Sequence, residues 1–178
     1  MGLIHVYFGD GKGKTTAAVG LSVRARGSGL PVLFQQYLKD GSSSELDLLR
    51  QLGIEVTSGQ PEGAKGFTWE LNTAHLALLR TSQDARLEEA FTWLAAHPDG
   101  GLLVLDETLA SVNLGLLDAS RLYELMDRVQ LLSAGPDLVL TGRDPSDELR
   151  GRADYLSEIR LLKHPFEKGI AARRGIEF

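Results

Sequence analysis

Residues 9–16 have the composition of a phosphate-binding loop. They read Gly-Asp-Gly-Lys-Gly-Lys-Thr-Thr and follow a short apolar run, Leu3–Phe8. Glycine lets a backbone wrap closely around an anion, and a helix that begins after the loop points its free N–H groups at the same anion. In this arrangement Lys14 would reach the phosphates of a nucleotide, and the Thr15 hydroxyl would ligate Mg²⁺.

The loop is one residue shorter than the common pattern, which would place its first glycine one position before Gly9. A glycine-rich turn without a ligand is the alternative. The apolar run before the loop and the predicted helix after it argue against that alternative. The predicted nucleotide-binding residues are Gly9, Asp10, Gly11, Lys12, Gly13, Lys14, Thr15 and Thr16.

Further polar groups follow two other apolar runs. Asp106 and Glu107 come directly after Leu102–Leu105, where a carboxylate could hold Mg²⁺ directly or through water. A surface acidic pair that caps the next segment is the alternative. Arg143 follows the strand predicted to end at Thr141, and it could contact phosphate or form a bidentate ion pair with a carboxylate. The sequence leaves both roles of Arg143 open.

Two aromatic residues, Phe67 and Trp69, flank Thr68 in a segment that follows Gly66. One interpretation is a helix start in which Thr68 is the cap and the rings pack inward. The other is an aromatic surface against a large flat ligand. The residue pattern by itself supports both interpretations equally.

Predicted strands and helices alternate along the chain. The predicted strands span residues 3–8, 32–36, 54–57, 102–105, 137–141 and 155–162. The predicted helices span residues 15–26, 44–52, 119–133 and a long stretch within 72–96. This alternation predicts one α/β domain over residues 1–178, with a mainly parallel central sheet and helices on both faces. Ligands of such sheets bind beyond the carboxyl ends of the strands, where the polar segments described above fall.

The composition excludes several classes of function. The absence of cysteine excludes disulfides, thiolate metal sites and cysteine nucleophiles. The histidines show no metal-binding pattern, and no Ser-His-Asp set is evident. A net charge of −5 disfavours nucleic acid as a partner. No apolar run approaches the ~20 residues of a membrane span, and the start of the chain lacks a signal-peptide pattern, so we expect a cytoplasmic protein.

Segments spread over nearly the whole chain resemble, in collinear order, the P-loop class of ATP:corrinoid adenosyltransferases, also called cob(I)alamin adenosyltransferases. The segments are Gly9–Ala18, Gln36–Lys39, Gly66–Glu70, Val104–Glu107, Thr141–Arg143 and the tail from Lys163 to Phe178. The shortened loop, the Phe-Thr-Trp-Glu segment and the tail are specific in combination. The resemblance implies a three-layer, P-loop NTPase-like (RecA-like) α/β fold.

The resemblance also implies a reaction in which ATP donates its 5′-deoxyadenosyl group to the cobalt of cobalamin or a precursor corrinoid. Cobalt in the Co(I) state is a strong nucleophile that attacks the 5′ carbon and expels triphosphate, so no side-chain nucleophile is needed. The implied task of Lys14, the loop amides and Mg²⁺ on Thr15, Asp106 or Glu107 is to neutralise the leaving triphosphate. In the family the nucleotide lies reversed in its loop compared with ordinary ATPases.

The family resemblance further assigns a role to Phe67 and Trp69. In the family, such aromatic residues pack under the corrin and displace the lower ligand of Co(II), which makes reduction to Co(I) easier. Carried over, Phe67 and Trp69 join Lys14 as expected catalytic residues. A flavoprotein reductase as electron donor and a homodimer are also implied.

Several features depart from the family pattern. Asp10 replaces the usual asparagine, and a carboxylate near triphosphate is unfavourable unless it is turned away or paired with a lysine or Mg²⁺. Thr108–Ser111 replaces the polar and aromatic residues that often follow the acidic pair. Typical members carry an N-terminal extension that helps cover the site, and because this chain begins at its first strand we expect a more open corrinoid site.

Two other functions stay open from the sequence. A diverged P-loop ATPase or kinase would need a loop that presents the γ-phosphate outward and a base or water-orienting residue, and the shortened loop disfavours it. A catalytically silent nucleotide- or corrinoid-binding protein is compatible with Asp10. Release of intact triphosphate, and turnover of ATP with chemically reduced cobalamin, would distinguish the three.

Overall fold

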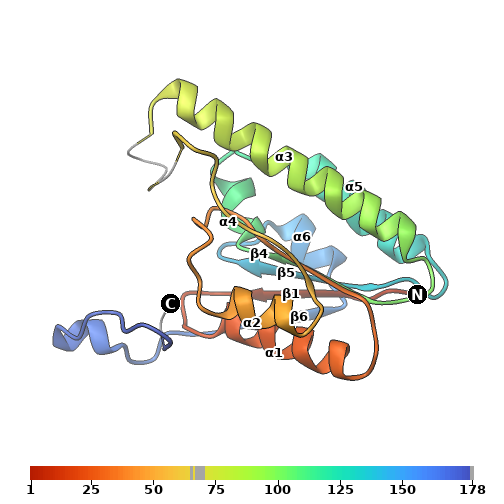
Figure 1. The fold of residues 1–178 in the computed structure, drawn as a ribbon, viewed down its shortest axis with the longest axis horizontal. Coiled ribbons are helices and arrows are strands. Elements are labelled where there is room, and N and C mark those ends of the chain that lie inside the picture. The colour runs from red at the N-terminus through yellow and green to blue at the C-terminus, as the bar shows by residue number, and fades with distance from the viewer. Residues whose placement is uncertain (65, 67–70, 177–178) are drawn as a thin grey trace.

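The computed structural model describes residues 1–64, 66 and 71–176, and its strands form one parallel sheet (Figure 1). The strands are β1 (Ile4–Phe8), β2 (Val32–Gln36), β3 (Glu55–Thr57), β4 (Leu102–Asp106), β5 (Asp137–Gly142) and β6 (Tyr155–Glu158). They lie in the order β3-β2-β4-β5-β1-β6, and every neighbouring pair is parallel. All six carboxyl ends therefore open on the same edge of the sheet.

Helices cover both faces of this sheet, which makes the three layers of the predicted α/β fold (Figure 1). On one face lie α1 (Lys14–Gly27) and α2 (Glu45–Gln51). On the other face lie α3 (Thr73–Ala96), α4 (Thr108–Asn113), α5 (Ala119–Leu131) and α6 (Asp147–Arg152). A short 3-10 helix, η2 (Pro165–Lys168), lies in the C-terminal tail, which extends away from the sheet and turns back toward it at its end.

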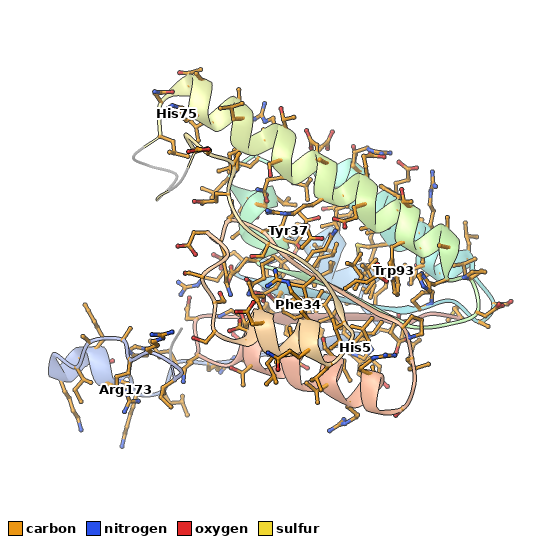
Figure 2. The ribbon with its side chains drawn as sticks, in the orientation of Figure 1. His5, Phe34, Tyr37, His75, Trp93 and Arg173 are labelled. Carbon is orange, nitrogen blue, oxygen red and sulfur yellow. The ribbon has the colours of Figure 1, made fainter. Side chains whose placement is uncertain are left out.

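Burial on both faces explains why the central strands are continuous apolar runs. In β2, Leu33 packs into the core under α3 and α5, whereas Phe34 packs into the core under α1 and α2. Tyr37, just past the strand, returns to the α3 side, and Figure 2 shows it and Phe34 on opposite sides of the sheet. Every residue of β2 and β4 is buried, as expected for central strands of a parallel sheet.

The structure differs from the predicted elements mainly at the sheet edge and in short helices. The predicted strand 155–162 ends at Glu158. The N–H of Ile159 donates the last ladder bond to Phe8, and its carbonyl oxygen then accepts a hydrogen bond from Gly11 of the glycine loop. Three short helices were not predicted: α4, α6 and η2 have six, six and four residues, too few for helical periodicity to be read. Within the described ranges, no helix combines the length and the apolar character that a bilayer crossing requires.

The core makes a direct stability prediction at Leu103, which is fully buried between β2 and β5. Replacing Leu103 with alanine should lower the free energy of unfolding by about 2–5 kcal/mol, because it removes apolar contacts and leaves a cavity. Urea unfolding followed by circular dichroism measures this loss. Leu131→Ala, at an 83% exposed side chain, is the matched control and should stay within about 0.5 kcal/mol of the wild type. Equal effects in the two variants would contradict this core.

Candidate functional site

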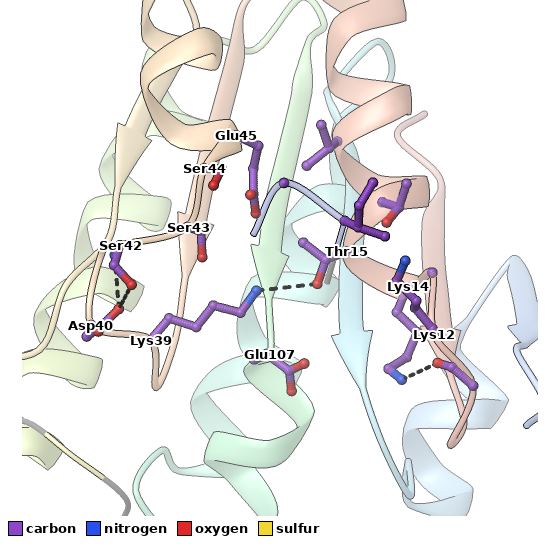
Figure 3. Close-up of a pocket in the computed structure, with 16 residues that line it drawn as sticks. Lys12, Lys14, Thr15, Lys39, Asp40, Ser42, Ser43, Ser44, Glu45 and Glu107 are labelled. Carbon is purple, nitrogen blue, oxygen red and sulfur yellow. Dashed lines mark hydrogen bonds between the residues drawn. The ribbon is translucent and has the colours of Figure 1, made fainter. Parts of the chain in front are cut away.

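A pocket of about 750 Å³ opens at the carboxyl edge of the sheet, beside the glycine loop (Figure 3). Its walls come from the loop and the start of α1, from the chain between β2 and the start of α2, from the residue after β4, and from the end of the tail. The lining residues are Gly11, Lys12, Gly13, Lys14, Thr15, Thr16, Val19, Lys39, Asp40, Ser42, Ser43, Ser44, Glu45, Glu107, Gly175 and Ile176. The pocket therefore brings together most of the loop residues predicted to bind nucleotide.

The glycine loop depends on backbone conformations and close contacts that side chains would prevent. Gly9 and Gly13 have φ angles of 112° and 124°, in the region that favours glycine. A Cβ atom on Gly9 would lie 2.5 Å from the carbonyl oxygen of Ile159. The same oxygen accepts a 2.8 Å hydrogen bond from the N–H of Gly11. The end of β6 thus holds the loop in shape from one side.

Lys14 is the first residue of α1 and reaches back across the loop. Its Nζ donates hydrogen bonds to the carbonyl oxygens of Gly9, at 2.6 Å, and Gly11, at 2.9 Å. Burial lowers the pKa of the Lys14 ammonium, and the nearby Glu107 carboxylate opposes that effect. The ammonium and the N-terminal amides of α1 place positive potential on the same side of the pocket.

Asp106 is fully buried at the end of β4 and receives donors from three other parts of the chain. Its Oδ1 accepts hydrogen bonds from the hydroxyls of Thr15, at 2.8 Å, and Thr141, at 2.7 Å. Its Oδ2 lies 2.9 Å from Nζ of Lys39 and 3.4 Å from Nε2 of Gln36. A buried carboxylate needs such partners, because an unpaired charge in the interior is costly. Asp106 therefore joins α1, β2 and β5 around one group.

Glu107 follows Asp106 and turns into the pocket. Its backbone has a φ angle of 61°, which is unusual for a residue other than glycine, and α4 begins at the next residue. The N–H of Glu107 donates a 2.9 Å hydrogen bond to the hydroxyl of Thr141. Burial raises the pKa of the Glu107 carboxyl, and the charge of Asp106 adds to the rise, whereas Lys39 and Lys14 lower it.

Thr15, Asp106 and Glu107 supply hydroxyl and carboxylate oxygens, the ligands that Mg²⁺ prefers. Among the described residues, no cluster of three or more histidine, aspartate or glutamate side chains could hold a metal by itself. A few protein oxygens, completed by phosphate and water, are the usual environment of Mg²⁺ with a nucleotide. In the structure the ammonium of Lys39 already contacts two of these groups. Its Nζ lies 2.9 Å from Oδ2 of Asp106. It also lies 3.5 Å from Oγ1 of Thr15, the contact drawn in Figure 3.

Asp10 and Arg143 lie beside the pocket and do not line it. Nη1 of Arg143 lies 3.6 Å from Oδ1 of Asp10, and their side chains are 60% and 75% exposed. Arg143 therefore makes one exposed contact with a carboxylate rather than the bidentate ion pair that the sequence left as one of two roles, and its partner is the aspartate that departs from the family pattern. An exposed pair of this kind contributes little to stability. Phosphate contact by Arg143 or Asp10 stays a prediction.

The predicted aromatic residues Phe67 and Trp69 lie outside the described residues. Gly66, directly before them, is described and exposed. Whether the two rings pack inward or face a flat ligand therefore stays a prediction.

A protein-family model described as "ATP:corrinoid adenosyltransferase BtuR/CobO/CobP" matches residues 1–178. The chain belongs to the ATP:corrinoid adenosyltransferase family. It is 35% identical to a corrinoid adenosyltransferase of Pseudomonas aeruginosa over 99% of this chain and 84% of that protein. It is also 32% identical to the corrinoid adenosyltransferase CobA of Salmonella typhimurium and 34% identical to that of Escherichia coli K12, each over 99% of this chain and 86% of the relative.

The sequence prediction missed several residues of the pocket. Lys39 was recognised only as part of a family-like segment, although its place just after a predicted parallel strand is a position where ligand-binding residues gather. The run Ser42–Glu45 follows it and lines the same wall. Gly175 and Ile176 have no such signal, since only the path of the tail brings them to the pocket.

The raised pKa of Glu107 makes a pH prediction for the protein without ligand. A carboxyl whose pKa is higher in the folded state than the ordinary 4.5 adds stability below 4.5 and loses that contribution as the pH rises through the folded pKa. The variant Glu107→Gln cannot ionise there. Its stability relative to the wild type should therefore increase as the pH rises from about 4 to 7. Urea unfolding across this range measures the difference, and a difference independent of pH would contradict the assignment.

Proposed function

We propose that the protein transfers the 5′-deoxyadenosyl group of ATP to the cobalt of a reduced corrinoid and releases triphosphate. The observation that carries this proposal is the pocket that brings together the glycine loop, Lys14, Thr15 and Glu107. Asp106 lies buried next to it and accepts a hydrogen bond from Thr15. Such a pocket suits a polyphosphate, because backbone amides, an ammonium and cation-binding oxygens surround one space. Membership of the adenosyltransferase family supports the reaction type.

The leaving group explains why this site needs charge rather than a nucleophile. The electron pair of Co(I) forms the new Co–C bond, the bond between the 5′ carbon and its oxygen breaks, and that bonding pair departs with the triphosphate. The proposed tasks of the protein are to stabilise the growing negative charge through Lys14 and the loop amides and to hold the 5′ carbon in line with cobalt. We propose that Gly9–Thr16 binds the phosphates, in the reversed orientation that the family implies.

Mg²⁺ is part of the proposal, with Thr15, Asp106 and Glu107 as its protein ligands. When bound, the ion would supply positive charge to the triphosphate. Lys39 contacts Asp106 and Thr15 in the structure, so its ammonium would have to give way to the ion. From its position on the pocket wall, Lys39 could then pair with a phosphate oxygen.

The remaining elements of the proposal rest on the family. Phe67 and Trp69 would pack under the corrin and favour reduction of Co(II), and a flavoprotein reductase would supply the electron. We further propose a single-domain, cytoplasmic protein that acts as a homodimer on cobalamin or a precursor corrinoid. Arg143 and Asp10, which pair beside the loop, would border the triphosphate.

The deciding experiment mixes the protein with ATP, Mg²⁺ and chemically reduced cob(I)alamin under anaerobic conditions. The visible spectrum measures adenosylcobalamin, and phosphorus NMR distinguishes triphosphate from phosphate. Formation of adenosylcobalamin and triphosphate is expected. Release of phosphate without adenosylcobalamin would instead indicate an ATPase or kinase, and ATP binding without turnover would indicate a silent binding protein.

The charge of Lys14 leads to a mutational prediction. Lys14→Met keeps the length of the side chain and removes the ammonium that bridges the loop carbonyls. Turnover from cob(I)alamin should fall by about 10²–10³-fold, the usual cost of losing a group that stabilises developing charge. Lys168→Met, on an exposed lysine of η2, controls for the loss of a positive charge and should keep wild-type turnover. Wild-type turnover in Lys14→Met would contradict the phosphate site.

The position of Lys39 leads to a metal-binding prediction. Because its ammonium lies on the oxygens of Asp106 and Thr15, the variant Lys39→Met should bind a divalent cation about tenfold more tightly in the absence of nucleotide. Electron paramagnetic resonance of Mn²⁺, used in place of Mg²⁺, measures the affinity. The double variant Lys39→Met with Asp106→Asn should lose the gain. Unchanged or weaker Mn²⁺ binding in Lys39→Met would argue against competition at these oxygens.

A further inference from the structure

The described part of the chain between β3 and α3 is rich in glycine. It includes Gly59, Gly63 and Gly66, whose φ angles of 105°, 87° and 116° all lie in the region that favours glycine. Such a segment has high conformational freedom when it is not tied to the rest of the fold. Residues 67–70 follow directly, so whatever holds Gly66 determines where that segment begins.

One side chain, that of Gln60, makes this connection. Gln60 is 9% exposed, and its amide bonds to backbone atoms of two separate segments. Its Oε1 accepts a 3.0 Å hydrogen bond from the N–H of Gly66. Its Nε2 donates to the carbonyl oxygens of Gly66, at 3.2 Å, and Leu38, at 3.0 Å. The amide of Gln60 therefore joins Gly66 to the chain that leaves β2.

The other end of this connection leads to the phosphate pocket. Leu38 has a φ angle of 60°, a strained conformation for a branched residue, and its side chain packs against two core clusters. The next residue is Lys39, which contacts Asp106 and Thr15. Gln60 is thus hydrogen-bonded to the residue that directly precedes Lys39, and Lys39 forms the ion pair with Asp106.

A second contact holds the start of the same loop. Arg86 of α3, which is 6% exposed, donates a hydrogen bond to the carbonyl oxygen of Gly59. α3 is itself tied to β2 and β3, because Glu89 accepts hydrogen bonds from Gln35 and Thr57. With Gly59 held at one end, Gln60 is the described residue whose side chain spans the gap from the β2 end to Gly66.

We propose that Gln60 is a positioning residue that couples the phosphate pocket to the start of the 67–70 segment. The inference rests on the proposed function, in which that segment acts on the corrin. Gln60 is suited to this role because a side-chain amide can pair with both the N–H and the C=O of one peptide residue and still donate to a third group. Loss of the link would leave Gly66 free to move relative to Lys39, and orientation at a reacting centre is sensitive to shifts of about 1 Å.

The test uses three variants of the full chain. Gln60→Met keeps the size of the side chain and removes all its hydrogen bonds. Gln60→Glu keeps the acceptor for Gly66 N–H and replaces both donated bonds with a charge that faces carbonyl oxygens. Gln130→Met is the matched control, because Gln130 is a partly buried glutamine on α5 that donates a long 3.4 Å bond to Arg152. Circular dichroism and thermal unfolding check that each variant is folded.

Each variant is assayed from two starting points, cob(I)alamin made chemically and cob(II)alamin with a reductase. Electron paramagnetic resonance with ATP also measures how much Co(II) has lost its lower ligand. In both Gln60 variants the rate measured from Co(II) should fall by about 10- to 100-fold. The rate measured from Co(I) should fall several times less. The signal of Co(II) without its lower ligand should also be weaker than in the wild type. Gln130→Met should match the wild type in all three measurements.

The outcomes separate this inference from the proposed function. Suppose that the wild type forms adenosylcobalamin. If the rates of the folded Gln60 variants then fall equally from both starting points, or do not fall at all, the positioning role is overturned. If Gln60→Met does not fold, Gln60→Glu decides by the same criteria. If the wild type forms no adenosylcobalamin even from cob(I)alamin, the proposed function fails and the role of Gln60 in it fails too.

Discussion

The fully buried carboxylate of Asp106 is the constraint on which the arrangement of the site depends. A charge without contact to water must be balanced locally, and removing one partner of such a pair typically costs ~3–5 kcal/mol. Here the balance comes from the hydroxyls of Thr15 and Thr141 and the ammonium of Lys39. These groups lie far apart in the sequence. Because the Asp106 carboxylate needs all of them as partners, three strand ends and the first turn of α1 must lie close together.

The strand order determines which groups can meet at Asp106. β5 lies between β1, which leads into the glycine loop, and β4, which carries Asp106. Thr141 joins the end of β5 to the end of β4, because its hydroxyl donates to Asp106 and accepts from the N–H of Glu107. From the β1 side, the Thr15 hydroxyl after the glycine loop reaches the same carboxylate. On the other side of β4, the end of β2 brings Lys39 to the same carboxylate. A bound cation would thus enter a network that is already complete without it, which makes exchange with Lys39 a natural part of binding.

The same β2 end links the pocket to the loop before α3. Leu38 turns the chain with a left-handed backbone, after which Lys39 faces Asp106, and the carbonyl of Leu38 is bonded to Gln60. The pocket and the chain that precedes Phe67 are therefore connected through Gln60. In a reaction that must align ATP with a corrin, such a link would be useful if the two regions bind the two substrates as proposed, since errors in alignment reduce the rate steeply.

Local patterns in the sequence determined the class of fold and identified several of the residues that line the pocket. Alternating apolar runs and amphipathic stretches predicted the parallel sheet and its main helices, because strand burial and helix periodicity leave direct traces in residue order. The glycine loop with Lys14 and Thr15, and the Asp106–Glu107 pair, were predicted because glycine, lysine and carboxylates at strand ends have specific chemical uses. The short helices α4 and α6 were missed, since six residues carry too little periodicity.

Tertiary structure alone decided which of these groups touch. It paired Arg143 with Asp10 beside the pocket, placed Lys39 on Asp106, and brought the tail residue Ile176 to the pocket wall. It also made Gln60 a link between Leu38 and Gly66, although nothing in the residues around Gln60 distinguishes it from a surface glutamine. Such contacts depend on strand order and on the path of loops, which are set by packing over the whole sheet and leave no local pattern in the sequence.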